Sequence, residues 1–321
     1  MPSEFDLIAR HFTRPTPRTT LGPGDDGALL KPSPGMELAV STDMLVAGTH
    51  FFADTDPAQL GWKTLAVNVS DLAAMGARPR WALLAVSLPT VDEAWIAAFA
   101  EGFFACATRH DIDLVGGDTT RGSLGLCVTA LGEVPVGDAL RRDGAKPGDD
   151  IWVSGYPGLA ALGLAHLQGR VTLSDDPLHA RCVSLLQQPI PRVELGMALR
   201  QRRWAHSAID VSDGLLADLG HIAARSALDA EIFIAQLPEL PRHVDSELAR
   251  RCQLAGGDDY ELVFSAAPEK REELAGLAVE LDLPLWRIGR FDENAGRGDI
   301  RLTDEQGEPV AIGRKGFDHF D

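Results

Sequence analysis

The pattern of apolar and polar positions predicts two successive groups of strands and helices. In the first group, alternation or short apolar runs predict strands at 36–45, 81–88, 112–115 and 124–134. Helical spacing predicts a short helix and two long ones, at 4–12, 58–75 and 91–110. The mixture of strand runs and long helices is typical of α+β layers rather than of strict strand–helix alternation.

The second group contains more helices. Strands are expected at its C-terminal end and at 151–154, 208–211, 231–235 and 260–265. Helices are expected at 158–168, 177–187, 192–203, 215–227, 243–251 and 269–281. This order predicts a second domain in which helices cover a sheet.

A polar, glycine-rich stretch separates the two groups. GDALRRDGAKPGDD, residues 137–150, lacks the periodicity of either a helix or a strand. A chain of 321 residues is long for one compact core and sufficient for two. We therefore expect an N-terminal domain over residues 1–137 and a C-terminal domain over residues 148–321.

Charge and composition exclude several classes of protein. The net charge is −17, which argues against a broad nucleic-acid-binding face because such faces need Lys and Arg. No apolar run approaches the roughly 18 residues of a membrane span, and MPSEFDLIARHF does not have the pattern of a signal peptide. The four cysteines form no CxxC pair, so we expect reduced thiols and a cytoplasmic protein.

Part of the negative charge is concentrated in short segments at or near the ends of apolar runs. Hydroxyl groups flank most of them, and Asp and hydroxyl oxygens are the hard ligands that Mg²⁺ prefers. The five segments are Gly24-Asp25-Asp26, Ser41-Thr42-Asp43, Ser70-Asp71, Gly117-Asp118-Thr119 and Asp210-Val211-Ser212-Asp213-Gly214. They are the candidate metal site of this chain.

Each segment taken alone has a simpler explanation. Asp and Ser are common at helix N-caps and in turns, so Asp213 could cap the helix expected from Leu215. Ser70-Asp71 is different, because it lies inside the helix predicted over 58–75, with Asp71 on the apolar stripe. A buried carboxylate of this kind needs a cation or strong hydrogen-bond donors.

Taken together, the segments predict a site for several divalent cations. Two carboxylates 4 Å apart repel each other by about 4 kcal/mol at an effective dielectric constant of 20. If these aspartates meet in one cleft, cations are needed among them, and a cleft of this kind can clamp polyphosphate. The sequence contains no P-loop, protein-kinase, zinc-protease or serine-hydrolase motif that would indicate another chemistry.

The same segments resemble the thiamine-monophosphate kinase family. The resemblance rests on GPGDDGALL, STDMLVAGTHF, NVSDLAAMGA, GGDTTRG, RDGAKPGD, IDVSDGL, GGDDYEL and GFDHF, from about residue 5 to residue 320. It implies two α/β domains, with an N-terminal mixed sheet that pairs in a homodimer and a C-terminal α/β sandwich. It also implies ATP-dependent, Mg²⁺-dependent conversion of thiamine monophosphate to thiamine diphosphate by direct in-line transfer.

The resemblance assigns roles to individual residues. It implies metal ligation by Asp26, Ser41, Thr42, Asp43, Asp71, Asp118, Asp210 and Asp213. It implies ATP contacts from Gly117, Asp118, Arg142 and Ser212, and thiamine phosphate contacts from His50, Asp258 and Phe317. The family usually has Glu at the position of Asp258 and Trp or Tyr at that of Phe317, so these two contacts with the substrate are expected to differ.

No catalytic residue is expected beyond the metal ligands. The acceptor phosphate is already an anion at neutral pH, and its main need is relief from repulsion by the γ-phosphate. Two other functions are open: another ATP-using synthetase of the same superfamily, of the aminoimidazole-ribonucleotide synthetase type, and a non-catalytic protein that binds divalent cations. The expected partners are thiamine monophosphate, ATP and a second copy of the chain, with no nucleic acid and no membrane.

Overall fold

The computed structural model describes residues 4–173, 176–239, 244–311, 313 and 316–317. The chain divides into two compact units, one made of residues 1–72 and 77–138 and the other of residues 73–76 and 139–321. No helix in the described ranges combines the length and the apolar character that crossing a membrane requires.

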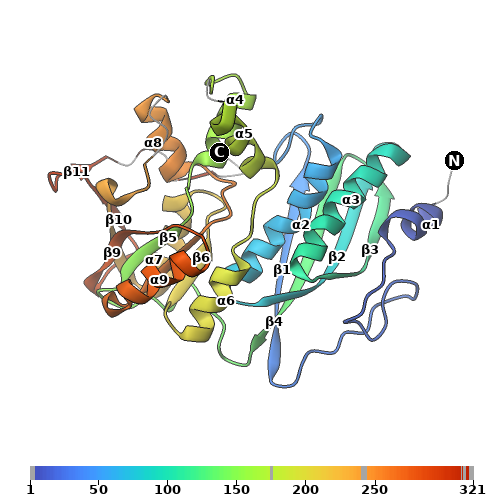
Figure 1. Cartoon of the computed structure of the whole chain (residues 1–321), viewed down its shortest axis with the longest axis horizontal. Helices are drawn as coiled ribbons and strands as arrows, with labels where there is room; N and C mark the ends of the chain where they lie inside the picture. Colours follow the sequence, from blue (N-terminus) through green and yellow to red (C-terminus); the bar gives the residue numbers. More distant parts are fainter. Residues whose placement is uncertain (1–3, 174–175, 240–243, 312, 314–315, 318–321) are drawn as a thin grey trace. The chain divides into compact units, whose positions relative to one another are not determined.

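The first unit is built on a four-stranded mixed sheet with the order β1-β4-β2-β3. Its strands are β1 (Met36–Val46), β2 (Arg78–Leu88), β3 (Asp113–Arg121) and β4 (Gly125–Pro135). Its helices are α1 (Glu4–Leu7), which continues as a π-helix (Ile8–Phe12), α2 (Pro57–Ala74) and α3 (Glu93–His110). Figure 1 shows α2 and α3 side by side across the sheet. The predicted order of strands and helices is confirmed.

Glycine allows α2 and α3 to pack closely. A Cβ atom on Gly61 would lie 2.0 Å from the carbonyl oxygen of Phe99, and one on Gly102 would lie 1.7 Å from that of Ala58. Phe99 and Phe103 are fully buried beside this crossing. A larger residue at either glycine would separate the helices and open the core.

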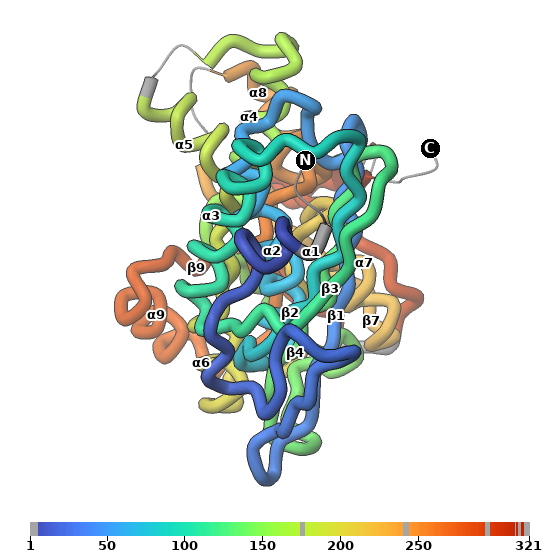
Figure 2. The backbone as a smooth tube through the Cα atoms, turned by 90° about the vertical axis from the view of Figure 1, so that its right-hand side faces the viewer, coloured from blue at the N-terminus to red at the C-terminus, as the bar shows by residue number. Residues whose placement is uncertain are grey.

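The two faces of this sheet have different surroundings. On the face toward α2 and α3, Ala82, Val128 and Ala130 are fully buried. Figure 2 shows both helices on one side of this unit's strands. The other side, here called the open face, exposes large apolar side chains that alternate along the strands: Leu38, Val40, Met44, Val46 and Leu83. Apolar patches of this kind mark interaction surfaces.

The strand predicted at 112–115 is longer than expected. Strand β3 continues to Arg121, and its residues from Gly116 pair in parallel with Leu83–Leu88 of β2. GGDTT is therefore part of a strand and not a turn, because pairing with β2 outweighs the weak strand propensity of Gly and Asp. A Cβ atom on Gly117 would lie 1.8 Å from the carbonyl oxygen of Leu84, so only glycine fits there.

The second unit is built on a seven-stranded sheet with the order β11-β10-β7-β9-β5-β8-β6. The strands are β5 (Asp150–Ser154), β6 (Ser207–Asp210), β7 (Leu228–Phe233), β8 (Leu262–Ala266), β9 (Leu285–Ala295), β10 (Ile300–Thr303) and β11 (Pro309–Val310). The helices are α4 (Leu159–Leu167), α5 (Asp176–Gln187), α6 (Val193–Arg202), α7 (Leu215–Ser226), α8 (Ser246–Ala255) and α9 (Arg271–Glu280). Short 3₁₀ turns lie at Ile234–Gln236 and Pro268–Lys270.

Both faces of the central strands in this unit are buried. Ile151 and Val153 of β5 join a core with α7, whereas Trp152, which lies between them, joins a core with α6 and α9. Strands buried on both faces read as continuous apolar runs, as β5 and β8 do. The predicted α+β architecture with a C-terminal sandwich is confirmed.

Two predicted strand limits in the second unit are wrong by a few residues. The strand expected over 231–235 ends at Phe233, where a 3₁₀ turn begins. The strand expected over 260–265 begins at Leu262, because Tyr260 has a φ of +52°. A positive φ is incompatible with an extended strand.

Candidate active site

Four polar residues meet where α2 crosses β1 in the first unit. The Ser41 hydroxyl donates a hydrogen bond to the Asp71 carboxylate, and the backbone N–H of Asp43 donates to Asn68 Oδ1 at 3.0 Å. Ser41, Asp43 and Asp71 are all partly buried. The donor expected for the helical Asp71 is therefore present, and three oxygen-bearing side chains from distant segments lie together.

The other predicted residues of this sheet lie elsewhere on it. Asp118 is exposed on β3, an outer strand, and β4 and β2 separate it from β1 by three strand spacings, roughly 14 Å in all. Thr42 points away from the α2 side, and its hydroxyl lies 2.9 Å from that of Thr129. Across the four strands, Asp118 is in register with Ala85, Cys127 and Met44. Asp43 precedes Met44 on β1, so it is one residue out of register with Asp118.

Asp26 lies in a closed loop before the first strand. Leu29 N–H donates to Leu21 O at 2.9 Å, and Thr20 N–H donates to Leu29 O at 3.0 Å, so residues 21–29 form a loop with paired ends. We call it the acidic loop. Asp25 and Asp26 are exposed at its tip.

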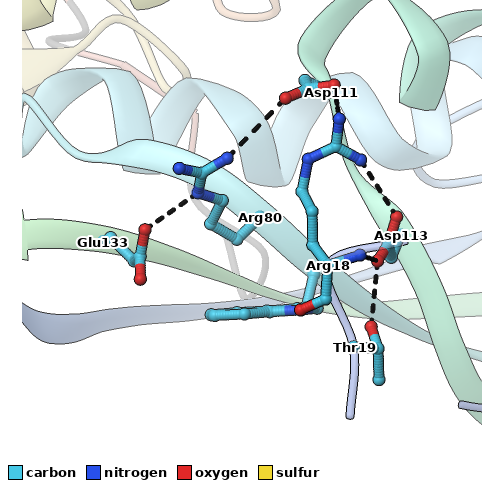
Figure 3. A network of polar contacts seen from close by, with 7 residues as sticks. Arg18, Thr19, Arg80, Asp111, Asp113 and Glu133 are labelled. Atoms are coloured by element: carbon cyan, nitrogen blue, oxygen red, sulfur yellow. Dashed lines mark hydrogen bonds and ion pairs between the residues drawn. The ribbon is translucent and has the colours of Figure 1, made fainter. Parts of the chain in front are cut away.

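A network of ion pairs holds the chain on the N-terminal side of the acidic loop (Figure 3). Asp113, buried on β3, accepts from the Arg18 N–H at 2.8 Å, the Arg18 guanidinium at 3.2 Å and the Thr19 hydroxyl at 2.9 Å. The Arg18 guanidinium also contacts the more exposed Asp111. The Trp81 indole N–H donates to Arg18 O at 3.3 Å.

The same network holds the chain on the C-terminal side of the loop. Glu133 of β4 accepts from Ser33 N–H at 2.6 Å and from Arg80 Nε at 2.8 Å, and Figure 3 shows Arg80 between Glu133 and Asp111. Burial alone would raise the pKa of Glu133, but these donors outweigh burial and lower it below its usual value. The acidic loop is thus fixed by its flanks.

His50 is fixed at the end of β1. Its ring Nδ1 accepts from the Val46 N–H at 3.0 Å, and the backbone N–H of His50 donates to Val46 O at 3.0 Å. Because Nδ1 is an acceptor, a neutral ring carries its proton on Nε2. This is the tautomer that a histidine needs in order to donate to a phosphate oxygen through Nε2.

Arg142 lies in the glycine-rich stretch between the two groups of elements. Its side chain is exposed, and its carbonyl oxygen accepts from the Ser226 hydroxyl at 3.1 Å. A Cβ atom on the neighbouring Gly144 would lie 2.0 Å from His206 O. This segment belongs to the second unit, and its backbone packs closely on that unit's residue His206.

In the second unit, the segment Asp210 to Gly214 forms a turn between β6 and α7. Asp210 is buried at the end of β6, whereas Ser212 and Asp213 are partly buried. The N-cap of α7 is Gly214, without a capping side chain, so Asp213 does not cap this helix. We call residues 212–214 the SDG turn.

The backbone N–H groups of the SDG turn donate to Asp218, a residue that is not among those predicted from the sequence. Asp218 Oδ2 accepts from the backbone N–H groups of Ser212 at 2.9 Å, Asp213 at 3.1 Å and Gly214 at 3.2 Å. Burial raises the pKa of Asp218 to about 7; the Asp213 carboxylate adds to this rise and the three N–H groups oppose it. Asp218 lies among apolar helical positions, the same signal that identified Asp71.

The GGDDYEL segment adopts a strained turn beside the SDG turn. Asp258 and Tyr260 have φ values of +67° and +52°, and the Tyr260 hydroxyl donates to Asp258 Oδ1 at 3.2 Å. Such conformations cost about 1–3 kcal/mol each and cluster at functional sites. Between them lies Asp259, whose carboxylate accepts from the N–H groups of Gly158 at 2.7 Å and Ala160 at 3.3 Å.

Buried carboxylates anchor this strained turn. Burial raises the pKa of Asp259 well above its usual value, despite the two N–H donors at the start of α4. Glu261 accepts from the Ser154 hydroxyl at 2.5 Å and from Arg192 at 2.7 and 2.5 Å. These contacts hold the middle and the C-terminal end of the turn, which presents Asp258.

Phe317 also reaches the SDG turn. Its backbone N–H donates to Asp213 O at 2.9 Å, and its side chain is 48% exposed. The rest of the GFDHF motif, from residue 318 onward, lies outside the described residues. Asp210, Ser212, Asp213, Asp258 and Phe317 are thus brought together within one unit from three distant segments.

The chemistry of these donors suits magnesium. In the described part of the chain, no group of three or more His, Cys, Asp or Glu side chains is arranged as a metal site. The side chains that gather at β1 and α2 supply carboxylate and hydroxyl oxygens, and the partly buried Ser212 and Asp213 supply the same kinds of atom. Oxygen ligands of this kind fit Mg²⁺.

Comparisons with known proteins extend over the whole chain. Residues 24–134 match the family described as AIR synthase related protein, N-terminal domain, and residues 146–300 match the C-terminal domain of the same family. The chain is 47% identical to the thiamine-monophosphate kinase of Escherichia coli (strain K12), over 99% of this chain and 98% of that protein.

Solved structures give the same result. The thiamine-monophosphate kinase of Stenotrophomonas maltophilia K279a is 49% identical, with a TM-score of 0.83 and 95% of each chain covered. AaThiL complexed with AMPPCP and TMP is 28% identical, with a TM-score of 0.77, covering 98% of this chain and 96% of that chain.

Proposed function

Because the chain belongs to the AIR-synthase-related family and, within it, to the thiamine-monophosphate kinases, we propose that it phosphorylates thiamine monophosphate with ATP. An oxygen of the acceptor phosphate forms a bond to the γ-phosphorus of ATP, the bond from that phosphorus to the β,γ-bridging oxygen breaks, and ADP leaves. The products are thiamine diphosphate and ADP. The relative solved with AMPPCP, an ATP analogue, and TMP supports this pair of substrates.

The proposed reaction needs charge neutralisation more than a base. Several Mg²⁺ ions would be held by Asp26, Ser41, Thr42, Asp43, Asp71, Asp118, Asp210 and Asp213, and when bound they would offset the repulsion between the two phosphorylated substrates. In addition, Arg142 offers a guanidinium to the nucleotide phosphates, beside Gly117, Asp118 and Ser212. The protein's own groups bind and align the substrates.

For thiamine phosphate we propose three contacts. His50, with its proton on Nε2, donates to the phosphate, and Asp258 is presented by the strained turn. Phe317 is partly exposed and offers an aromatic face to the cationic heterocycle. We propose that residues 1–137 provide most of the metal and ATP contacts and that residues 148–321 complete the set of ligands.

The observation that carries this proposal is the full-length match to thiamine-monophosphate kinases. It is combined with the meeting of Ser41, Asp43 and Asp71 in the first unit and of the SDG turn, Asp258 and Phe317 in the second. The test is ADP formation with thiamine monophosphate, with thiamine and other phosphomonoesters as controls, before and after removal of Mg²⁺ by a chelator. We expect turnover only with thiamine monophosphate and Mg²⁺. ATP turnover that does not require thiamine monophosphate would indicate the aminoimidazole-ribonucleotide synthetase type, and cation binding without turnover would indicate the non-catalytic alternative.

We also propose that the chain forms a homodimer through the open face, and that it acts in the cytoplasm. Val40 and Met44 are 55% and 61% exposed on this face, an unfavourable arrangement for apolar side chains unless a partner covers them. The four unpaired cysteines support a reducing compartment. Sedimentation of the wild type should give a dimer and Val40→Lys a monomer, whereas a monomeric wild type would contradict the dimer.

A further inference from the structure

We propose that Asp218 is a positioning residue that sets the SDG turn, and through it Asp258 and Phe317, in their binding arrangement. The inference rests on the proposed function, because it gives a role to a residue beside the proposed ligands. Asp218 itself would touch neither substrate.

Asp218 fixes the turn that precedes α7 and does not cap the helix itself. The first backbone N–H groups of a helix have no partner within the helix, and Ser, Thr, Asp or Asn at the N-cap usually binds one of them. Here the N-cap is Gly214, with a φ of +126°, and one oxygen of the buried Asp218 binds three successive N–H groups before the helix. The turn is thereby fixed at each of its residues.

The carbonyl oxygens of the same turn hold the two segments proposed to bind thiamine phosphate. Ser212 O accepts from Asp258 N–H at 2.8 Å, and Asp213 O accepts from Phe317 N–H at 2.9 Å. Each peptide unit of the turn is rigid, so an N–H fixed by Asp218 also fixes the direction of the carbonyl attached to it. The three segments are therefore coupled through the backbone.

Two glycines show how closely these segments approach. A Cβ atom on Gly257 would lie 2.3 Å from Ser212 O, and one on Gly316 would lie 2.8 Å from Asp213 O. With no space for adjustment, a rotation of the turn would displace both neighbours. Since the turn also contains Ser212, which is proposed to contact ATP, one change at Asp218 should affect the contacts of both substrates.

The geometry requires an oxygen acceptor at this position, and not a negative charge. All three N–H groups converge on Oδ2, so the carbonyl oxygen of Asn can replace it. Leu has a similar size but no acceptor, and it would leave three donors unsatisfied, at a cost of about 1–3 kcal/mol for each buried group. The pair of variants separates positioning from direct metal ligation, which needs the charge.

The experiment compares Asp218→Asn with Asp218→Leu in the full-length protein. Hydrogen exchange at residues 212–214, 258 and 317 reports on the turn without any activity measurement. We expect Asn to keep amide protection and both KM values near those of the wild type. We expect Leu to lose this protection and to raise the KM for thiamine monophosphate and for ATP by about tenfold, a free energy of about 1.4 kcal/mol.

Several outcomes would overturn the proposal. One is an Asn variant that folds, with an unchanged unfolding midpoint, but has KM values raised as much as those of the Leu variant, since the charge would then be the requirement. Another is a Leu variant with wild-type protection and kinetics. If Leu does not fold, Asp218→Ala is judged by the same criteria. A wild type without thiamine phosphate kinase activity would refute the proposed function, while the exchange data would still decide the role of Asp218.

Discussion

The acidic loop of the first unit and the SDG turn of the second unit carry the same type of residue but are held in opposite ways. The acidic loop is held only at its flanks: Asp113 and Glu133 accept from the backbone N–H groups of Arg18 and Ser33 and form ion pairs with Arg18 and Arg80. Its own aspartates are exposed. The SDG turn is bound residue by residue through its backbone, around the buried Asp218. Asp26 can therefore adjust to a cation, whereas Ser212 and Asp213 are preorganised.

This contrast indicates a division of work. A rigid turn can orient ligands without an entropic cost on binding, because its backbone is already ordered. A loop held only by its ends loses conformational freedom when a cation binds, so its affinity depends on how well its flanks are anchored. Changes to metal ligands should accordingly abolish activity, and changes to anchors should weaken binding.

The largest effect is expected for Asp71→Asn. Removal of one carboxylate charge from the metal-binding set should lower the rate of ADP formation at least about a hundredfold, while the fold remains because Asn can still accept from Ser41. Glu101→Gln, an exposed change on the neighbouring α3, is the matched control and should have no effect. Full activity of Asp71→Asn would contradict both the metal site and the division of work.

The second effect tests the preorganised side. Asp258→Ala should raise the KM for thiamine monophosphate by about tenfold, the loss of one charge-assisted contact, and should leave the KM for ATP unchanged. Steady-state kinetics with each substrate varied in turn will measure this, with the exposed Glu272→Ala of α9 as control. An effect confined to ATP would show that this turn does not serve the acceptor.

The order of elements could be predicted from the sequence because apolar periodicity specifies which face is buried. For Asp71, the sequence predicts only that its carboxylate needs a cation or hydrogen-bond donors. The spacing on α2 places Asp71 on the apolar stripe, but it does not reveal that the donor is Ser41 of β1. The strand predicted at 112–115 stops before GGDTT because Gly and Asp rarely continue a strand, whereas the pairing of GGDTT with β2 depends on tertiary structure.

The supporting residues were missed for a different reason. Asp113 and Asp259 bind backbone N–H groups of segments that are distant in the sequence, and no local pattern reveals where those segments lie. Only Asp218 carries a local signal, an acidic residue at an apolar helical position. Residues that touch ligands lie in recognisable motifs, but the residues that hold those motifs depend on the completed fold.

The third effect concerns the residues that anchor the acidic loop. Asp113 is the anchor to be changed, and Asp111, which contacts the same Arg18, is the control. Asp113→Asn removes the charge from a buried acceptor of three hydrogen bonds. It should lower the free energy of unfolding by about 1–3 kcal/mol. It should also raise the Mg²⁺ concentration needed for activity. Asp111→Asn changes a partner of the same Arg18 whose side chain is 53% exposed, and it should cost less than about 1 kcal/mol. Urea unfolding and Mg²⁺ titration of activity will compare the two; equal effects would show that burial does not matter here.

The smallest effect is a pH dependence of opposite sign in the two units. The pKa of Glu133 is lowered in the folded state, so its contribution to the unfolding free energy is present above the unfolded pKa of about 4.5 and is lost as the pH falls below it.

The pKa of Asp259 is raised, so the folded state holds its proton more tightly and gains stability as the pH falls from the folded pKa toward about 3.8. Urea unfolding between about pH 2.5 and pH 8, followed by hydrogen exchange at residues 18–33 and 158–162, will separate the two contributions. Glu133→Gln should remove the acid-induced loss in the first unit, and Asp259→Asn should remove the acid-induced gain in the second. If the unfolding free energy changes with pH in the same direction in both units, their buried carboxylates are solvated alike. That result would contradict the contrast between the two units.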